Sequence, residues 1–525
     1  MSEPYKIGNI AGHMAKMFLN NPLTMILAIS ILLLGFITLN IAPREEDPQI
    51  AVSGGSIIIM VPGASPEAIT NVVIKPLERR IREIKGVEHV YGTAMNNVGM
   101  LNVQYFIGED RESSNLKLYD KVMQNMDTMP KGVMMPLVKP FDIDIDIPIV
   151  TVAFYLKDGG EENTIEQYHL VREIQQDINA IDNVSKSTLK GIHSPQFNIL
   201  VDIDKLSGFH LSMGQIMRSV RAIANNAPNI EAPSQNGTLI VFGVQNSIEN
   251  VGDLQNLIVA QYMGSPIYLK DVAEVELSND IQHFQRSQLS VRENNATFED
   301  PIAQATLTVS KLKGTNAVTI AKDVTDMLQE KYDELDAAGI GYIVTRNYGI
   351  RANEAVSELI HHLVITIGII GLILIPFLGW RESLVVSIAV PMILATTLFI
   401  AYMTDQTINR ITLFAFLLSL GLIVDDAIIV IENIHRRMHL KETEDQTFDE
   451  IIIEATDEIG PSTNIATIAI ILTMVPMAFV GGMMGQFMKP IPLNVPVALA
   501  VSLFVAYVFT PFLAKKLIKR AKGTH

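Results

Sequence analysis

The chain has 525 residues, of which 48% are hydrophobic and 18% are charged, and its formal net charge is -16 at pH 7. This acidic balance, with no basic run long enough to follow a phosphate backbone, argues against nucleic acid as a partner. The absence of cysteine excludes disulfides, thiolate metal sites and cysteine nucleophiles, and it suits an oxidising compartment.

Apolar runs near the roughly 20-residue length that crosses a bilayer stand at both ends of the chain, with a polar segment between them. A short cytoplasmic or interfacial segment, 1–21, precedes the first run, and we assign 22–42 to a transmembrane helix. A cleaved signal peptide is the alternative, but this run is long for one and lacks a clear small-x-small cleavage site. The sequence therefore favours an uncleaved anchor.

The long polar segment, 43–355, predicts an α+β domain outside the membrane. Its first part follows the order βαββα, which is most of a ferredoxin-like unit. The expected elements are a strand at 56–61, a helix at 65–85, strands at 87–93 and 100–107, and a helix at 114–126. Ser65-Pro66-Glu67 marks the start of the first helix, because serine caps a helix, proline fits its first turn and an acid favours its positive end.

A second unit of the same kind begins with a strand at 147–156, a helix at 164–181 and a strand at 184–191. The ends of the two first helices read IREIKGVEHV and INAIDNVSKS, which indicates an internal repeat. A helix at 212–225 with flanking strands predicts a small module inserted into the second unit. The expected fold class is an α-helical membrane protein with a large α+β extracytoplasmic domain of ferredoxin-like βαββαβ subdomains.

Three acids precede the second unit. Asp142, Asp144 and Asp146 alternate with isoleucine, which would place them on one face of a strand. A solvated face is the preferred interpretation, and a cation site is the alternative.

Five further apolar runs lie within residues 356–514 and bring the expected number of transmembrane helices to six. They stand at approximately 356–378, 384–403, 411–431, 462–480 and 493–513. Basic residues gather on one side of these spans, at Lys6, Lys16, Arg381, Arg436, Arg437 and in the tail 515–525. Since such residues collect on the cytoplasmic side, we expect both termini in the cytoplasm and the domain 43–355 outside it.

The fourth run places two adjacent acids, Asp425 and Asp426, among leucine, isoleucine, valine and alanine. Charged groups at membrane depth are costly and usually mark a pathway or a relay. The two side chains lie about 100° apart on a helix, so both can point into one interior sector. Because neighbouring buried carboxylates cannot easily both be ionised, we expect the pair to take up and release a proton. A purely structural pair, satisfied by neighbouring helices, is the alternative.

Glu432 lies seven positions after Asp425, on the same helix face and nearer the cytoplasmic interface. It is a candidate for the proton exit, and an interfacial charge is the preferred alternative.

The stretch GLIVDDAIIVIENIHRR at 421–437 closely resembles the fourth-span signature of the resistance–nodulation–division (RND) transporters, of the multidrug, acriflavine-resistance type with paired aspartates. Further stretches resemble the family along the chain: VPGASPEAI at 61–69, IAVP at 388–391 and VPMAFVGGMMGQ at 475–486. The combination is much more specific than any one piece.

The resemblance implies a proton-driven exporter of the bacterial inner membrane that moves hydrophobic or amphiphilic compounds, such as drugs, dyes and detergents, by H+ antiport. It implies that Asp425 and Asp426 form the proton relay. It also implies two porter subdomains with a docking subdomain inserted at about 192–280, and a trimer that works with a periplasmic adaptor and an outer-membrane channel.

The departure from the family is a missing second half. Family members repeat the plan of one span, an outer segment and five spans, and a lysine of their tenth span faces the aspartate pair. The six runs here contain no lysine or arginine. A homodimer on the family's pseudo-twofold plan would set four acids together without a cation, which is strongly unfavourable. We therefore expect a different second half, on a separate chain or in a longer parent sequence.

Two rival functions remain. The 24 methionines, including Met134, Met135, Met483, Met484 and Met488, would suit a heavy-metal exporter because thioethers bind soft ions, although methionine also fills cores and the metal branch usually has one aspartate. The other rival is a non-transporting half-length scaffold subunit.

An enzyme is not expected. The chain has no Walker-type glycine loop to hold nucleotide phosphates. Its histidines lack metal-ligand spacing, and His361 and His362 stand at a span boundary. We expect no cofactor and no resident metal.

Overall fold

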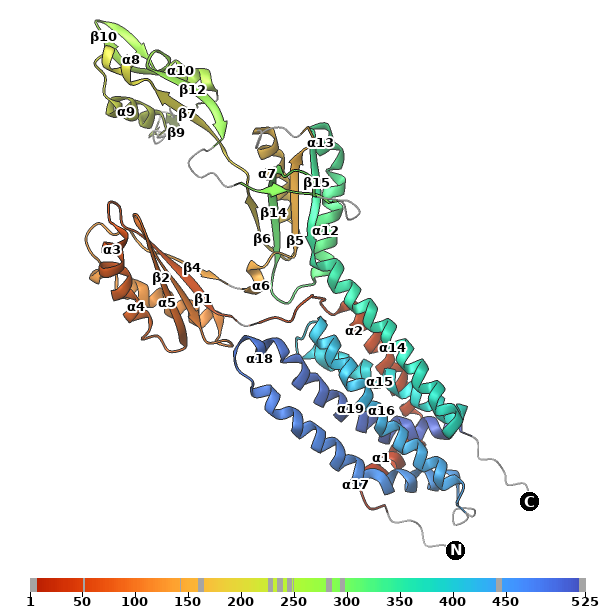
Figure 1. The fold of residues 1–525 in the computed structure, drawn as a ribbon. Coiled ribbons are helices and arrows are strands. Elements are labelled where there is room, and N and C mark those ends of the chain that lie inside the picture. Colours follow the sequence, from red (N-terminus) through yellow and green to blue (C-terminus); the bar gives the residue numbers. More distant parts are fainter. Residues whose placement is uncertain are drawn as a thin grey trace.

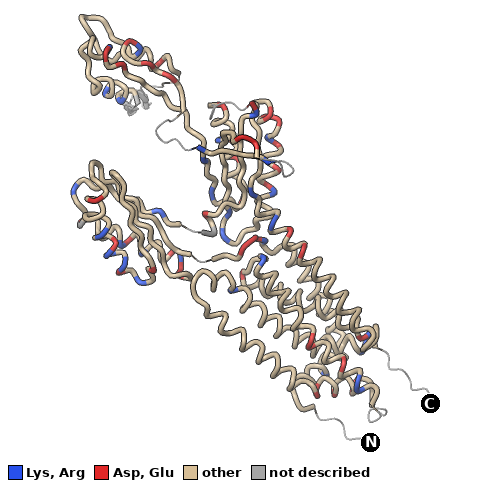
Figure 2. Tube along the Cα trace, in the orientation of Figure 1, with Lys and Arg blue, Asp and Glu red and all other residues tan. Residues whose placement is uncertain are grey.

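The computed structural model describes residues 7–50, 52–141, 143–158, 165–224, 230–233, 239–242, 248, 250–279, 286–292, 298–440 and 446–518. Long helices form a bundle, and three modules built around β-strands lie beyond one end of it (Figure 1). Charged side chains are frequent over the β modules and sparse along the middle of the bundle (Figure 2). This distribution agrees with an apolar surround for the helices and water around the modules.

Six helices in the described part of the chain are long and apolar enough to cross a membrane, which confirms the expected number. They are α2 (Leu23–Ile41), α14 (Tyr348–Leu378), α15 (Trp380–Met403), α16 (Arg410–Met438), α17 (Phe448–Met474) and α19 (Pro490–Leu517). Two begin well before the predicted runs, α14 at Tyr348 and α17 at Phe448. Hydropathy detects only the apolar part of a helix, whereas the hydrogen-bond ladder continues through polar turns, and Thr447 with Glu450 caps α17.

In the described part of the bundle, two shorter helices were not predicted. They are α1 (Ile10–Leu19) and α18 (Gly482–Met488), the latter preceded by a 3-10 turn at Val475–Phe479. The α1 helix packs against α17 and α19 at the end of the bundle away from the β modules (Figure 1). The carboxylate of Asp457 on α17 accepts hydrogen bonds from the backbone N–H groups of Gly8 and Asn9, at 2.8 and 3.0 Å. These bonds fix the start of α1.

The first β module contains one four-stranded antiparallel sheet in the order β2-β3-β1-β4. Its strands are β1 (Gly54–Met60), β2 (Val87–Met95), β3 (Val98–Tyr105) and β4 (Leu137–Phe141), and its helical segments are α3 (Pro66–Ile69), a π turn (Thr70–Ile74), α4 (Lys75–Ile81), α5 (Arg111–Gln124) and a 3-10 turn (Met126–Thr128). The expected single helix at 65–85 is thus interrupted and ends at Ile81. Pro76 explains the interruption, because it has no N–H to donate to the preceding turn.

The second β module repeats the same connections. Here β6 pairs with β14, β14 with β5, and β5 with β15, all antiparallel. Its elements are β5 (Val150–Leu156), α7 (Ile165–Asn179), β6 (Val184–Lys190), β13 (Gln288–Leu289), β14 (Ile302–Lys311), α12 (Ala317–Glu330), α13 (Tyr332–Ala337) and β15 (Ile340–Asn347). The last strand, β15, leads directly into α14, so this module and the bundle are joined by continuous structure.

The prediction that the three alternating aspartates lie on a strand is wrong. Residues Ile143–Asp146 form a helical turn, α6, and Asp146 pairs with Lys186, while Asp142 lies outside the described residues. A strand needs a neighbour for its N–H and C=O groups, and both edges of β5 are already taken by β14 and β15.

A third module is inserted between β6 and β14 and lies furthest from the bundle (Figure 1). Strands β7 (Pro195–Val201) and β12 (Ala273–Asn279) leave and return side by side as an antiparallel pair. Between them stand α8 (Ile203–Gly208), α9 (Met213–Ala224), β8 (Ile230–Pro233), β9 (Leu239–Phe242), α10 (Val251–Gln255), β10 (Ile258–Tyr262), β11 (Ser265–Tyr268) and α11 (Leu269–Val272). The module has its own apolar core, with Leu269 and Val272 fully buried.

The linker after α2 ties the bundle to the second module. The Glu45 carboxylate pairs with Lys311 of β14 and accepts a hydrogen bond from the hydroxyl of Thr407, at 2.9 Å. Both charged groups are almost fully buried, at 4% and 7% exposure. Because Thr407 stands in the loop just before α16, the linker joins the aspartate-bearing helix to the second β module.

Candidate functional site

The helix that carries the two aspartates is α16, at the centre of the bundle. Asn409 caps its start by accepting hydrogen bonds from the N–H groups of Ile411 and Thr412, at 3.1 and 3.0 Å. Asp425 and Asp426 stand near its middle, 15 and 16 residues after Arg410. At about 1.5 Å per residue, they lie more than 20 Å from the helix end near the β modules and thus deep in the apolar part of the bundle.

Asp426 points into the bundle and is 7% exposed. The hydroxyl of Ser502, on α19, donates a hydrogen bond to its Oδ2 atom, and the hydroxyl of Thr467, on α17, is a second partner. Ser502 is fully buried and Thr467 nearly so. The carboxyl is therefore held by neutral hydroxyls, which can donate to the ionised form and accept from the protonated form.

Asp425 lies on the other side of the helix and is exposed in this chain. It belongs to a stripe at helical spacing that the other five long helices leave uncovered, hereafter the open face. The open face consists of Phe414, Leu417, Leu418, Gly421, Asp425, Ile429 and Glu432. We expected both acids to point into one interior sector. In this chain only Asp426 points into the bundle.

Glu432 is also on the open face, one turn before the basic end of α16. The neighbouring cation Arg437 is already paired, at 2.5 Å to Glu454 and 2.8 Å to Glu458, both on α17. In the part of the chain that the structure describes, no ion pair to Asp425, Asp426 or Glu432 is found. The pair of aspartates therefore has no counter-cation within the described residues.

Sequence reasoning missed Ser502 and Thr467. Each is one of several hydroxyl residues in a long apolar run, and such residues usually bond to the carbonyl of the preceding turn, as Thr397 does to Ile393. Only the packing of α16 against α17 and α19 distinguishes the two hydroxyls that bond to Asp426 from hydroxyls that bond within their own helix. The signal available in sequence was weak: both lie in the spans that follow the aspartate helix.

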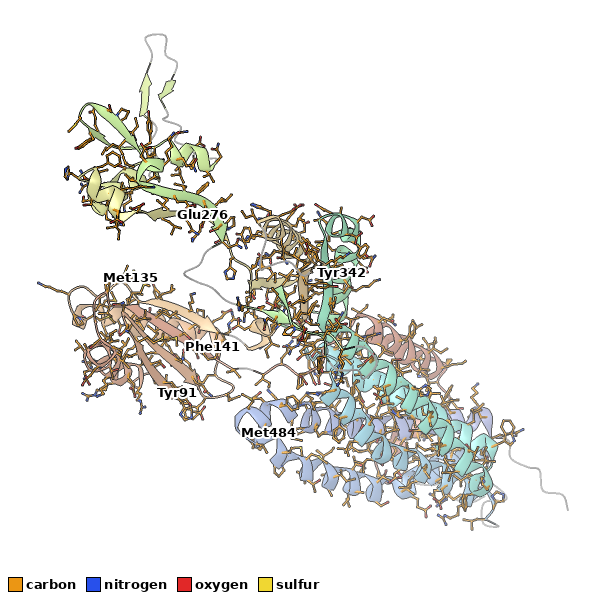
Figure 3. The ribbon with its side chains drawn as sticks, turned by 45° about the horizontal axis from the view of Figure 1, so that its top comes forward. Tyr91, Met135, Phe141, Glu276, Tyr342 and Met484 are labelled. Carbon is orange, nitrogen blue, oxygen red and sulfur yellow. The ribbon has the colours of Figure 1, made fainter. Side chains whose placement is uncertain are left out.

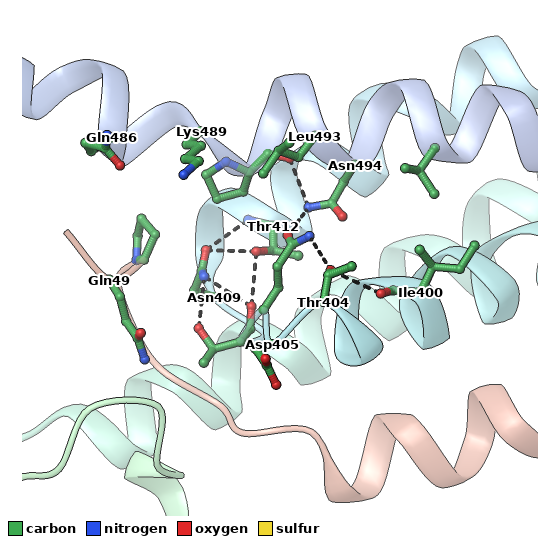
Figure 4. Close-up of a pocket in the computed structure, with 15 residues that line it drawn as sticks. Gln49, Ile400, Thr404, Asp405, Asn409, Thr412, Gln486, Lys489, Leu493 and Asn494 are labelled. Carbon is green, nitrogen blue, oxygen red and sulfur yellow. Dashed lines mark hydrogen bonds between the residues drawn. The ribbon is translucent and has the colours of Figure 1, made fainter. Parts of the chain in front are cut away.

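A pocket of about 370 Å³ with many polar lining residues lies at the end of the bundle near the β modules, between the loop before α16 and the start of α19 (Figure 4). Its polar groups are largely occupied with one another. The amide of Asn494 donates to Gln406 at 2.8 Å, and Gln406 donates to Thr404 at 3.0 Å. We interpret these bonds as the fastening of the loop to α19, and we assign no ligand to the pocket.

The methionines that suggested a soft-metal site form two separate groups, one in the first β module and one on α18. Met135, in the first β module, and Met484, on α18, stand in separate parts of the molecule (Figure 3). The described residues contain no cluster of three histidine, aspartate or glutamate side chains able to hold a metal ion.

Six long apolar helices, two α/β modules with the same connections and a buried acid at the centre of the bundle define a polytopic membrane protein. The family model described as AcrB/AcrD/AcrF family matches residues 14–525. The chain therefore belongs to this family of RND efflux transporters, which are membrane transport proteins and not enzymes.

Proposed function

We propose that the chain is a subunit of a proton-driven exporter in which Asp426 and Asp425 carry the transported protons. One observation carries this proposal: a carboxyl is buried in the middle of the bundle between hydroxyl groups of two other helices. A buried acid without a cation is tolerated when it is protonated. It is then poised to release that proton when its surroundings change, which is the event that an antiporter must couple to export.

The open face supports a second half-transporter as the partner. Asp425 and Glu432 face outward along an otherwise apolar stripe, and lipid alone would be a poor surround for them. A facing helix that carries a cation would compensate Asp425. We propose that this helix comes from a separate chain or from a longer parent sequence.

The remaining assignments follow from the family. We propose that the first and second β modules, each with the order βαββαβ, are ferredoxin-like porter subdomains, and that the third module is the docking subdomain. The complete assembly would be a trimer in the bacterial inner membrane, with both termini cytoplasmic and the three modules in the periplasm. There they would contact an adaptor and an outer-membrane channel.

We propose hydrophobic or amphiphilic compounds as the exported substrates, and heavy-metal cations as the second candidate. The scattered methionines and the paired aspartates favour the first class. Export of a fluorescent dye, compared with export of copper or silver ions by the same cells, distinguishes the two.

The central test replaces each aspartate by asparagine, D425N and D426N, in the assembled transporter. We expect D426N to abolish export and the accompanying proton flux while the protein still inserts and assembles, because an amide keeps the hydrogen bonds but cannot carry a proton. D405N, in the outer loop before α16, is the matched control. If the double variant D425N/D426N exports as well as the wild type, the chain acts as a scaffold and the proposal is wrong.

A further inference from the structure

A line of buried and partly buried polar groups continues from Asp426 toward the end of the bundle away from the β modules. It runs along the face of α17 that packs against α19 and α1. Its members recur at helical spacing: Asp457, Gly460, Thr463, Asn464 and Thr467. The candidate exit that the sequence suggested, Glu432 on the open face, has no comparable chain of buried partners among the described residues.

The centre of this line is the phenol of Tyr507, on α19. Its oxygen lies 2.5 Å from the Thr463 hydroxyl, 3.0 Å from Oδ1 of Asn464 and 3.4 Å from the carbonyl oxygen of Gly460. Tyr507 and Thr463 are 3% and 4% exposed. The phenol also lies within electrostatic range of the Asp426 carboxylate.

The step between Asp426 and Tyr507 is short. Thr467, which contacts Asp426, and Thr463, which contacts Tyr507, are four residues apart on α17, so their Cβ atoms lie about 6 Å apart on the same face. A single bridging water between the two hydroxyls would complete this step. From Thr467 to Asp457 the line is ten residues long, or about 15 Å, which is half the hydrocarbon thickness of a bilayer.

The line ends where α1 begins. Asp457 accepts the N–H groups of Gly8 and Asn9, and the Asn9 amide donates to the carbonyl of Asp457 at 2.5 Å. Gly460 allows this close approach, because a Cβ atom there would lie 2.5 Å from Oδ1 of Asn9. The first described residues of the chain thus cover the end of the polar line.

We propose that protons leave Asp426 along this line, through the hydroxyls of Thr467 or Ser502 to Tyr507 and Thr463, and then to the region of Asp457. Each hydroxyl accepts a proton on its oxygen and passes its own proton on, so no charge stays on the relay. Asp426 loses one proton, and water beside Asp457 gains one. The inference rests on the proposed function only in the direction of transport, because exchange along the line is measurable without any substrate.

The test follows the protonation of Asp426 directly, in the full chain reconstituted in lipid bilayers. After a rapid pH change, the infrared carbonyl band of the protonated carboxyl, identified by its loss in D426N, reports the rate. We expect Y507F and T463V to slow this change by about tenfold or more, because each removes a relay hydroxyl and keeps the shape of the side chain. Small weak acids should restore the rate in both variants.

Two matched controls separate the route from its alternatives. T397V removes a buried hydroxyl of α15 that donates a hydrogen bond to the carbonyl of Ile393 in the preceding turn, and its rate should equal that of the wild type. E432Q should also leave the rate unchanged. If E432Q slows the exchange and Y507F does not, protons leave by the open face and the inference is overturned.

The remaining outcomes are equally decisive. Unchanged rates in both Y507F and T463V would overturn the route even if D426N abolishes export. A slow rate that weak acids do not restore would show that the hydroxyls are structural, and it would also overturn the route. A third outcome separates the two proposals. If Y507F and T463V exchange slowly and weak acids restore the rate, the route is supported. If D425N/D426N nevertheless exports as well as the wild type, only the proposed function is wrong. If one variant fails to fold, the other still decides.

Discussion

At the scale of single residues, the Glu46 carboxyl is partly buried and lacks a hydrogen-bond partner for one of its oxygens, the buried Oε2 atom, in the described part of the chain. Burial raises the pKa of Glu46 above its ordinary value of 4.5, and the charge of Asp47 raises it further, although three nearby arginines act in the opposite direction. The folded state therefore holds the proton of Glu46 more tightly than the unfolded state does.

The sign of the pH dependence follows. A raised carboxyl pKa favours folding below the unfolded value, and this benefit is lost as the pH rises through the folded value. At pH 7 the ionised Glu46 is a penalty, so we expect E46Q to raise Tm by a few degrees there. The gain should vanish at pH 4, and thermal unfolding at both values measures it. An equal gain at both pH values would contradict a titration origin.

The pair of Glu45 and Lys311 gives a second prediction. K311M leaves the buried Glu45 carboxylate without its cation and should destabilise the protein by about 3–5 kcal/mol. The double variant E45Q/K311M should recover most of this loss, because no unpaired charge remains. K186M, which breaks the exposed pair with Asp146, is the control and should cost less than about 1 kcal/mol. Denaturant unfolding measures all three, and equal losses in K311M and K186M would contradict burial as the cause.

At the scale of elements, α1 illustrates a helix held by side chains from elsewhere in the sequence. D457A removes the acceptor for the N–H groups of Gly8 and Asn9, a change similar to the loss of a helix cap, which costs about 0.5–2 kcal/mol. We expect faster amide hydrogen exchange over Ile10–Leu19, with the bundle otherwise intact. T456V, at the preceding position of α17, is the control because the Thr456 hydroxyl donates to the carbonyl of Ile452 within its own helix. Unchanged exchange in D457A would show that packing alone holds α1.

The sequence was informative about elements where the signal is local. Hydropathy located the six long helices, and Ser65 marked the start of α3 because capping depends on adjacent residues. Prediction from the sequence failed where contacts with other elements determine the structure. The alternating aspartates form a helical turn because β5 has no free edge. Pro76 interrupts a helix that hydrophobic periodicity alone would continue. The partners of Asp426 escaped prediction for the same reason, since Ser502 lies 76 residues away.

At the scale of the whole molecule, the open face of α16 determines which partner the bundle can accept. A second copy related by a twofold axis would bring Asp425 and Glu432 against their own equivalents. Apolar neighbours on the same stripe, such as Phe414 and Leu418, would favour such a contact, and the acids oppose it. The negative charges of Asp425 and Glu432 therefore disfavour pairing between two identical chains and so contribute to the choice of partner.

This balance predicts how the chain behaves when it is expressed alone. The wild-type chain should not pair along α16, whereas D425N/E432Q should self-associate, because neutral amides can bond across a helix interface in lipid. Fluorescence energy transfer between labelled copies in bilayers, at a fixed ratio of chain to lipid, measures the difference, and D405N is the control. Removal of both charges should shift the dimer fraction about tenfold or more, if each apposed pair of like charges costs on the order of 1 kcal/mol. Equally strong transfer in the wild type would mean that two identical chains meet at this face, and the requirement for a different second half would then be lost.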